Sequence, residues 1–322
     1  MKYLKVWFFF MVGSLSLMGW TMNNWLMIWY LMEVCLILFM GLCTSGKGYS
    51  ISEMMMSYYL VQVSVSLFMA LFILFYMFNL GYSYSFILIM SLMIKMGMFP
   101  FHFWLIMICG KLEWWSFFIL STLMKLIPLV LLYYLSSMSS FFFVTVGSTV
   151  FGSFMGLNNN VIQKMMGYSS MINICWLIFS MSVSLSLFFL YFMSYMVMLW
   201  LLIYMFSNCE IFYINQFKFN SLSLSKKIIV FTYGLSVSGF PPFLGFLIKW
   251  LVVSCLWHVG LKFLLSLMIL VSVLAVYFYL QMFFFIMMVF SAWTKLHTIN
   301  FSGFGVFSFM FLVIYLILFI LY

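Results

Sequence analysis

Long apolar runs follow one another along this sequence, and they leave few folds open to it. Most are about 20 residues long, which is the length a helix needs to cross a hydrocarbon core of ~30 Å. Hydrophobic residues make up 68% of the chain and charged residues 5%, whereas soluble domains average about 45–50% and about 25%. A transmembrane barrel would instead show alternating segments of ~10 residues. The sequence therefore predicts an all-α polytopic membrane protein without a soluble domain of any size.

Polar and glycine-containing breaks divide the apolar runs into about eleven transmembrane helices. The run at 168–183 is short for a crossing, and the runs at 227–257 and 261–290 are long enough to leave an extra crossing open. We expect the first helix to be retained, because no small-residue cleavage site follows it. The helices are predicted at 3–21, 24–43, 57–79, 84–108, 115–135, 139–157, 168–183, 185–206, 227–257, 261–290 and 303–322.

The lysines between these helices predict how the chain is oriented. The 13 basic residues are all lysine and the four acidic residues are all glutamate. Such an excess indicates nucleic-acid binding in a soluble protein, but here the lysines are scattered through the loops, so no nucleic acid is expected. With eleven crossings, one face carries only Lys262, and the positive-inside rule then puts the N-terminus on the matrix or cytoplasmic side and the C-terminus opposite. The N-terminal face carries Lys2, Lys5, Lys47, Lys111, Lys164, Lys218, Lys226, Lys227 and Lys295.

Four ionisable residues lie inside predicted helices: Glu33, Lys95, Lys125 and Lys249. A charge at the bilayer centre costs roughly 2.5–3.5 kcal/mol on insertion scales, so such residues generally serve ion or proton passage. Burial favours the neutral amine of a lysine and a nearby carboxylate favours the ammonium, so a glutamate–lysine pair can act as a protonation switch. The alternatives are lysines that snorkel to the interface, above all Lys249, and a purely structural ion pair for Glu33.

Prolines interrupt the fourth and the ninth predicted helices. Pro100 follows Lys95 in the fourth helix, and we expect it to break the helix by freeing the carbonyl of Met96. The ninth helix has the reverse order, because its break at 238–245 contains two prolines and precedes Lys249. A lysine beside a helix break indicates a wet pocket inside a helix bundle, because freed backbone groups must be satisfied by neighbours or water.

Paired broken helices at corresponding places in two halves are a sequence sign of inverted repeats in transporters. An odd number of helices in each repeat inverts the second repeat against the first. We therefore expect a single membrane domain over 1–322, composed of two inverted five-helix repeats at 1–135 and 136–290 and a C-terminal helix within 291–322.

His102 lies seven residues after Lys95 and would share its face in an unbroken helix. It is either hydrogen-bonded at the break or a member of a proton relay. The sequence has no dinucleotide-binding, P-loop, zinc-protease or nucleophile-elbow motif and no Cys/His metal spacing. We expect no cofactor and no metal in this chain, so any redox groups belong to other subunits.

Four segments of the sequence resemble, in their order and spacing, the subunit 2 family of mitochondrial NADH dehydrogenase. The members of this family are antiporter-like membrane-arm subunits of respiratory complex I. The segments are MIKMGMFPFHFW, STLMKLIP, GLNNNVIQKMMGYSSMINICW and SGFPPFLGFLIKWL. The resemblance implies that Glu33 pairs with Lys95 and that Lys125 is the central connecting lysine. It also implies that Lys249 belongs to a second half-channel that faces the intermembrane space.

The resemblance further implies a core proton-translocating subunit of NADH:ubiquinone oxidoreductase in the mitochondrial inner membrane, with FMN, iron–sulfur clusters and ubiquinone held by other subunits. The implied partners are the membrane-arm subunits 4 and 4L, accessory subunits and phospholipids such as cardiolipin. Two alternatives stay open. One is a secondary cation/proton antiporter subunit of the same fold, and the other is a structural membrane-arm scaffold without its own channel.

Overall fold

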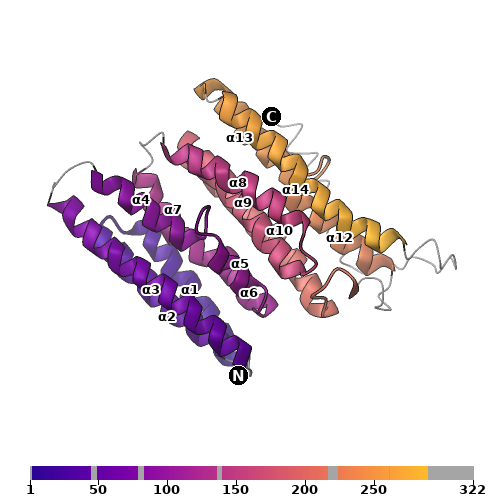
Figure 1. The fold of residues 1–322 in the computed structure, drawn as a ribbon, viewed down its shortest axis with the longest axis horizontal. Coiled ribbons are helices and arrows are strands. Elements are labelled where there is room, and N and C mark those ends of the chain that lie inside the picture. Colours follow the sequence, from indigo (N-terminus) through magenta and orange to yellow (C-terminus); the bar gives the residue numbers. More distant parts are fainter. Residues whose placement is uncertain are drawn as a thin grey trace. The chain divides into compact units, whose positions relative to one another are not determined.

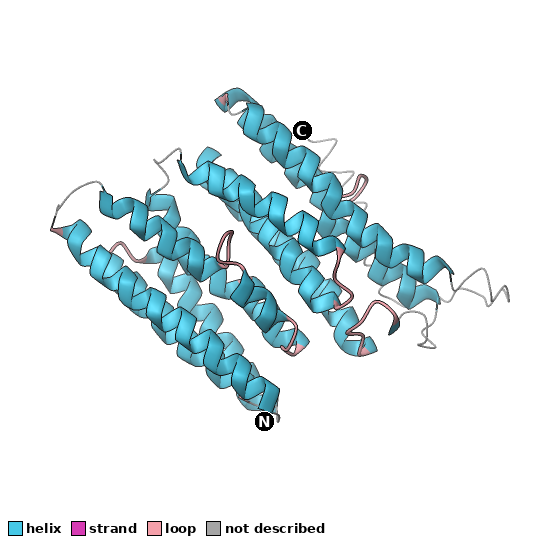
Figure 2. Ribbon diagram, in the orientation of Figure 1, coloured by secondary structure: helices cyan, strands magenta, loops and turns pink. Residues whose placement is uncertain are grey.

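The computed structural model describes residues 2–44, 49–78, 83–135, 140–216, 224–260 and 262–288. Every regular element in these ranges is a helix (Figure 1), and Figure 2 shows short loops between them. The chain divides into two compact units, Met1–Ser148 and Thr149–Tyr322. Six helical spans of the described residues are long and apolar enough to cross a membrane. The prediction of an all-α polytopic membrane protein is confirmed at this level.

The helices follow the apolar runs predicted from the sequence, and their ends differ mainly where polar residues extend a helix beyond its apolar run. The predicted helix at 303–322 lies outside the described residues. The elements are α1 Lys2–Thr21, α2 Trp25–Cys43, α3 Tyr49–Met77, α4 Ser83–Met96, α5 Phe103–Cys109, α6 Trp114–Ser121, α7 Leu123–Leu135, α8 Ser140–Leu157, α9 Ile162–Val183, α10 Leu185–Cys209, α12 Leu224–Ser238, α13 Leu244–Val259 and α14 Lys262–Met288.

Each unit has one central span that is more buried than its neighbours. In the first unit this is Trp114–Leu135, of which 83% is buried, and α7 within it packs against α1, α2 and α4. In the second unit it is α9, of which 89% is buried and which packs against α10 and α13. The other four spans are only 33–50% buried. The apolar surface that they leave exposed fits a lipid environment or contact with other subunits.

Two ion pairs join loops and helix ends of the first unit. The Nζ of Lys5 lies 2.6 Å from a Glu113 carboxylate oxygen, and the Nζ of Lys111 lies 3.7 Å from one of Glu53. The start of α1, the start of α3 and the loop before α6 therefore meet at one end of this unit. That is the face on which the sequence places Lys5 and Lys111 together.

The break in the first unit begins at Gly97, and the expected position at Pro100 was therefore slightly wrong. Gly97 has φ +69°, a left-handed conformation that ends α4 at Met96. The N–H of Gly97 donates to the Ile94 carbonyl and the N–H of Met98 to that of Met93, each at 3.0 Å. This is the Schellman pattern, in which the glycine and the next residue satisfy the last helical carbonyls. Pro100 lies in the loop that follows and does not interrupt a continuing helix.

The break in the second unit has the same construction. Gly239 has φ +83° and follows the last residue of α12. Its N–H donates to the Ser236 carbonyl at 3.2 Å, and the N–H of Phe240 donates to the Leu235 carbonyl at 3.1 Å. A glycine three residues before a proline thus follows the end of α4 in the first unit and of α12 in the second. The lysine precedes the break in the first unit and follows it in the second, but the glycine conformation and the backbone hydrogen bonds are of the same kind.

A third break was missed by the sequence analysis, which predicts one helix over 115–135. Thr122 has φ −121° and ψ −78°, and it separates α6 from α7. Its hydroxyl donates to the Phe118 carbonyl at 2.6 Å, and its own carbonyl accepts from the N–H of Lys125 at 3.1 Å. Pro128, six residues after this break, stays inside α7. Lys125 therefore lies in the first turn of a helix and not in its middle.

Candidate functional site

Glu33 and Lys95 form a partly buried ion pair in the first unit. Glu33 comes from α2 and Lys95 from the last turn of α4, and the lysine Nζ lies 3.1 Å from the glutamate Oε1. The lysine side chain is 4% exposed and the glutamate side chain 21%. Lys95 is therefore enclosed, whereas Glu33 reaches the edge of the unit. The pairing implied by the resemblance is present in the structure.

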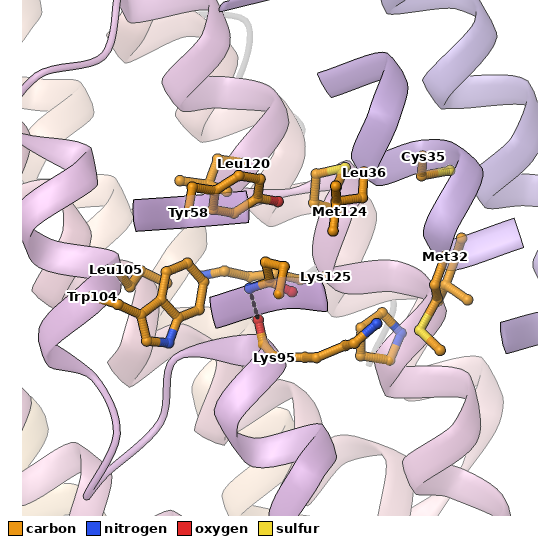
Figure 3. Close-up of a pocket in the computed structure, with 13 residues that line it drawn as sticks. Met32, Cys35, Leu36, Tyr58, Lys95, Trp104, Leu105, Leu120, Met124 and Lys125 are labelled. Carbon is orange, nitrogen blue, oxygen red and sulfur yellow. Dashed lines mark hydrogen bonds between the residues drawn. The ribbon is translucent and has the colours of Figure 1, made fainter. Parts of the chain in front are cut away.

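Lys95 and Lys125 line the same cavity, which has a volume of about 30 Å³. Figure 3 shows the two lysines with the residues around them, which come from α2, α3, α4, α5, α6 and α7. Both lysines are buried, at 9% and 5% exposure. The helix breaks at Gly97 and Thr122 bring the two lysines to helix termini beside this cavity. A cavity lined by two lysines is an arrangement in which a proton can pass from one amine to the other through water.

Two polar residues of this cavity, Tyr58 and Gln62, were missed by the sequence analysis. Both lie on α3, and the Gln62 amide donates to the backbone carbonyl of Lys95 at 3.4 Å. A signal was available, because Gln62 is an amide within an apolar span. Polar residues inside a transmembrane helix generally face the interior of a bundle.

His102 lies at the break between α4 and α5, immediately before the first residue of α5. Its Nδ1 is 3.2 Å from the Pro100 carbonyl oxygen, and its ring stacks at 6.3 Å on that of Phe99. These contacts fit the interpretation of a histidine hydrogen-bonded at the break. The Lys95–Lys125 cavity is lined by other residues.

Lys249 lies in the second unit and is buried beside the break there. It is 6% exposed, and its Nζ donates to the Ser238 carbonyl at 2.6 Å. The indole ring of Trp176 lies 5.9 Å from the same Nζ. The C-terminal end of a helix carries a partial negative charge, and an aromatic face also attracts cations. Lys249 is therefore a buried amine between a helix end and an aromatic ring, and not a lysine that snorkels to an interface.

Polar side chains of α9 also form hydrogen bonds to α10 and α14 in this unit. The Tyr279 hydroxyl is 2.9 Å from the Ser169 hydroxyl, and the Tyr191 hydroxyl donates to the Asn173 side chain at 3.2 Å.

Gly245 allows α13 to approach α12, because a Cβ at this position would overlap the carbonyl oxygen of Ser236. Close packing of the two half-helices is what brings Lys249, one turn further along α13, to the end of α12.

Comparisons with known proteins show which family and which fold this chain resembles. Residues 81–275 match the family described as NADH:quinone oxidoreductase/Mrp antiporter, transmembrane. The chain is 33% identical to NADH-ubiquinone oxidoreductase chain 2 of Anopheles gambiae over 77% of this chain and 75% of that protein. It is 36% identical to the chain 2 protein of Aedes aegypti over 55% of this chain and 52% of that protein.

A solved structure of respiratory complex I from Thermus thermophilus contains a chain of similar fold. The TM-score is 0.74 at 16% identity, over 89% of this chain and 72% of that chain. At this identity the likeness concerns the fold alone. The family match and the relative from Anopheles gambiae carry the assignment of the family, and the family match covers both the Lys95 break and the Lys249 break. The chain therefore belongs to the NADH-ubiquinone oxidoreductase chain 2 family, within the NADH:quinone oxidoreductase/Mrp antiporter proteins.

Proposed function

We propose that this chain is a proton-translocating membrane subunit of respiratory NADH:ubiquinone oxidoreductase. The observation that carries the proposal is the cavity shared by Lys95 and Lys125, with Lys95 also paired to Glu33. Electron transfer and its redox centres belong to other subunits of the complex. This chain supplies buried groups that take up and release protons when the charge around them changes.

In this proposal Glu33 controls the protonation of Lys95. A glutamate 3.1 Å away favours the ammonium form, and a glutamate that turns away or is protonated leaves burial to favour the neutral amine. The 21% exposure of Glu33 leaves it open to the charge state of a neighbouring subunit. Lys95 then releases its proton towards Lys125. Lys249 serves the second half-channel, and His102 is a candidate relay member at the first break.

We further propose that the whole chain makes eleven crossings, with two inverted five-helix repeats over 1–135 and 136–290 and a last helix within 291–322. Support comes from the two units, each of which has its fourth helix broken after a glycine with positive φ. The single membrane domain would lie in the mitochondrial inner membrane, with its N-terminus on the matrix side and its C-terminus on the intermembrane-space side. Subunits 4 and 4L, accessory subunits and cardiolipin are the proposed neighbours.

The test is proton pumping per NADH oxidised by the intact complex with Lys95→Met in this chain. The matched control is Lys111→Met, which removes a lysine of the same unit that is exposed and pairs only loosely with Glu53. We expect Lys95→Met to reduce pumping in a fully assembled complex and Lys111→Met to leave it near normal. Normal pumping by an assembled Lys95→Met complex would contradict the proposal.

The same experiment separates the two other functions considered. A scaffold whose lysines only hold helices together predicts that Lys95→Met lowers the yield of assembled complex but not the pumping of the complex that forms. A secondary cation/proton antiporter predicts proton movement driven by a cation gradient in vesicles that contain no NADH. The buried Glu33–Lys95 pair beside a cavity favours proton passage over the scaffold, because a structural pair needs no second amine on the same cavity.

A further inference from the structure

The cavity between Lys95 and Lys125 presents two polar side chains to which the proposed function gives no role. Tyr58 and Gln62 lie four residues apart on α3, and so they share one face of that helix. They are 2% and 5% exposed, and both line the cavity. Polar groups that are buried to this extent cost free energy of folding unless they are hydrogen-bonded. Their place on the cavity wall therefore calls for a partner inside the cavity.

The hydrogen bonds and ring contacts of these two residues leave polar atoms available. Gln62 uses its amide N–H on the Lys95 carbonyl at 3.4 Å, which leaves its side-chain oxygen as an acceptor. The Tyr58 ring packs edge-on against Phe39 at 5.3 Å and at a tilt against Trp104 at 5.9 Å. These ring contacts hold the tyrosine in place without using its hydroxyl. Leaving a buried hydroxyl unpaired destabilises the protein, so we expect a hydrogen-bond partner for it.

The cavity is large enough for water to pair with these atoms. Its volume is about 30 Å³, and one water needs roughly 10–15 Å³ of such space and two to four polar partners. About two waters therefore fit. The Tyr58 hydroxyl, the Gln62 oxygen and the two lysine amines supply polar groups on the wall. The remaining wall is mostly apolar, with Leu36, Leu105 and Leu120 among its members, and this confines water to the polar side.

We propose that Tyr58 and Gln62 hold water in this cavity and that the Tyr58 hydroxyl carries protons between Lys95 and Lys125. The inference rests on the proposed function and deepens it. Gln62 is a positioning residue, because its oxygen accepts a hydrogen bond from water and exchanges no proton. Tyr58 is a relay residue, because a hydroxyl accepts one proton while it donates another.

The transfer conserves every proton. An N–H bond of the Lys95 ammonium breaks as an O–H bond forms on the adjacent water. That water passes one of its protons to the Tyr58 hydroxyl, which releases its own proton to the next water. The last water gives a proton to the neutral amine of Lys125. Lys95 ends neutral and Lys125 ends as the ammonium, while the tyrosine and both waters regain their starting composition.

The test is Tyr58→Phe in the intact complex, with Tyr59→Phe as the matched control. Tyr58→Phe removes only the hydroxyl and keeps the ring contacts, whereas Tyr59 is the next residue of α3, is 43% exposed and lies outside the cavity lining. We expect Tyr58→Phe to slow NADH-driven proton pumping by about threefold or more, because loss of a positioned proton-transfer group commonly costs at least that much. The ratio of rates in H₂O and D₂O should also change, which a purely structural effect would not produce. The control should behave as wild type.

Lys95→Met, measured alongside Tyr58→Phe, separates the relay through Tyr58 from the proposed function. Loss of pumping in Lys95→Met with normal pumping and a normal isotope ratio in Tyr58→Phe would overturn the relay while the proposed function stands. Normal pumping in Lys95→Met would overturn the proposed function itself. If Tyr58→Phe fails to assemble, a map of the wild-type complex that resolves waters decides. Water bonded to the Tyr58 hydroxyl is expected, and a dry cavity would overturn the inference.

Discussion

Gly239 and Lys249 pack so closely that a Cβ at position 239 would lie 2.9 Å from the lysine Nζ. The contact holds the amine 2.6 Å from the Ser238 carbonyl, at the negative end of α12. In the first unit Lys95 itself occupies the last turn of α4, which is also the first half of a broken helix. Both lysines thus meet the C-terminal end of a half-helix, although one precedes and the other follows its proline.

Gly239→Ala should impair proton pumping in addition to destabilising the backbone. Its φ of +83° disfavours any side chain with a Cβ by roughly 1–2 kcal/mol, and the added methyl also crowds Lys249. Gly260→Ala is the matched control, because its φ is +91° and a Cβ there meets nothing within 4 Å. Thermal stability of the complex should fall in both variants, whereas pumping should fall only in Gly239→Ala. Equal pumping in the two would show that the contact with Lys249 does not matter.

Lys249→Met should stop or strongly slow proton transfer through the second unit. The substitution keeps much of the apolar stem but removes the amine from the Ser238 carbonyl. Lys262→Met serves as the comparison, since Lys262 is exposed and its Nζ lies 5.3 Å from the centre of the Trp257 ring. Proton pumping per NADH in reconstituted vesicles measures both. A Lys262→Met complex as defective as Lys249→Met would point to a general loss of positive charge instead.

Glu33→Gln should lower pumping, and its effect should depend on Lys95. Removing the carboxylate leaves the enclosed amine without its counter-charge at 3.1 Å. A double-mutant cycle with Lys95→Met measures the coupling of the two residues in the stability of the complex, which is typically about 0.5–3 kcal/mol for residues in contact. We expect the double variant to be more stable than the sum of the two single losses of stability predicts. Glu113→Gln is the control. Its pair with Lys5 is half exposed, and such pairs contribute about 0–1 kcal/mol.

Tyr279→Phe should lower stability without changing proton transfer. The tyrosine hydroxyl lies 2.9 Å from the Ser169 hydroxyl and links α14 to α9. Hydrogen bonds between membrane helices average about 0.6 kcal/mol in measured cases, so a small decrease in thermal stability is expected. Tyr277→Phe on the same helix, 50% exposed, should change neither property. A pumping defect in Tyr279→Phe would assign this hydroxyl to the proton path.

Hydropathy was sufficient to locate the helices, because each apolar run must satisfy its backbone hydrogen bonds internally in a lipid environment. It was less informative about where helices break. Pro100 attracted attention as the breaking residue, but α4 ends at Met96 because Gly97 adopts a left-handed conformation. Thr122 breaks a helix with no proline beside it, whereas Pro128 is accommodated within α7. A local break depends on which neighbouring groups satisfy the freed carbonyls, and the sequence does not state this.

The candidate lysines were recognisable because each is a charge inside an apolar run. Tyr58 and Gln62 gave a weaker signal, since an uncharged polar residue in a transmembrane helix is common and inexpensive by comparison. Only the packing of α3 against α4 and α5 places them on the cavity that Lys95 and Lys125 share.

The sequence by itself determined the fold class, the positions of most helices and the four ionisable residues within them, because each follows from the cost of exposing polar groups to lipid. The tertiary structure decided which of these residues meet. Lys95 and Glu33 are 62 positions apart and come within 3.1 Å only because α2 and α4 both pack against α3 and α7. Lys249 finds its partner because Gly245 lets two half-helices touch. Distances between helices depend on side-chain fit along their whole length, and so no local pattern contains them.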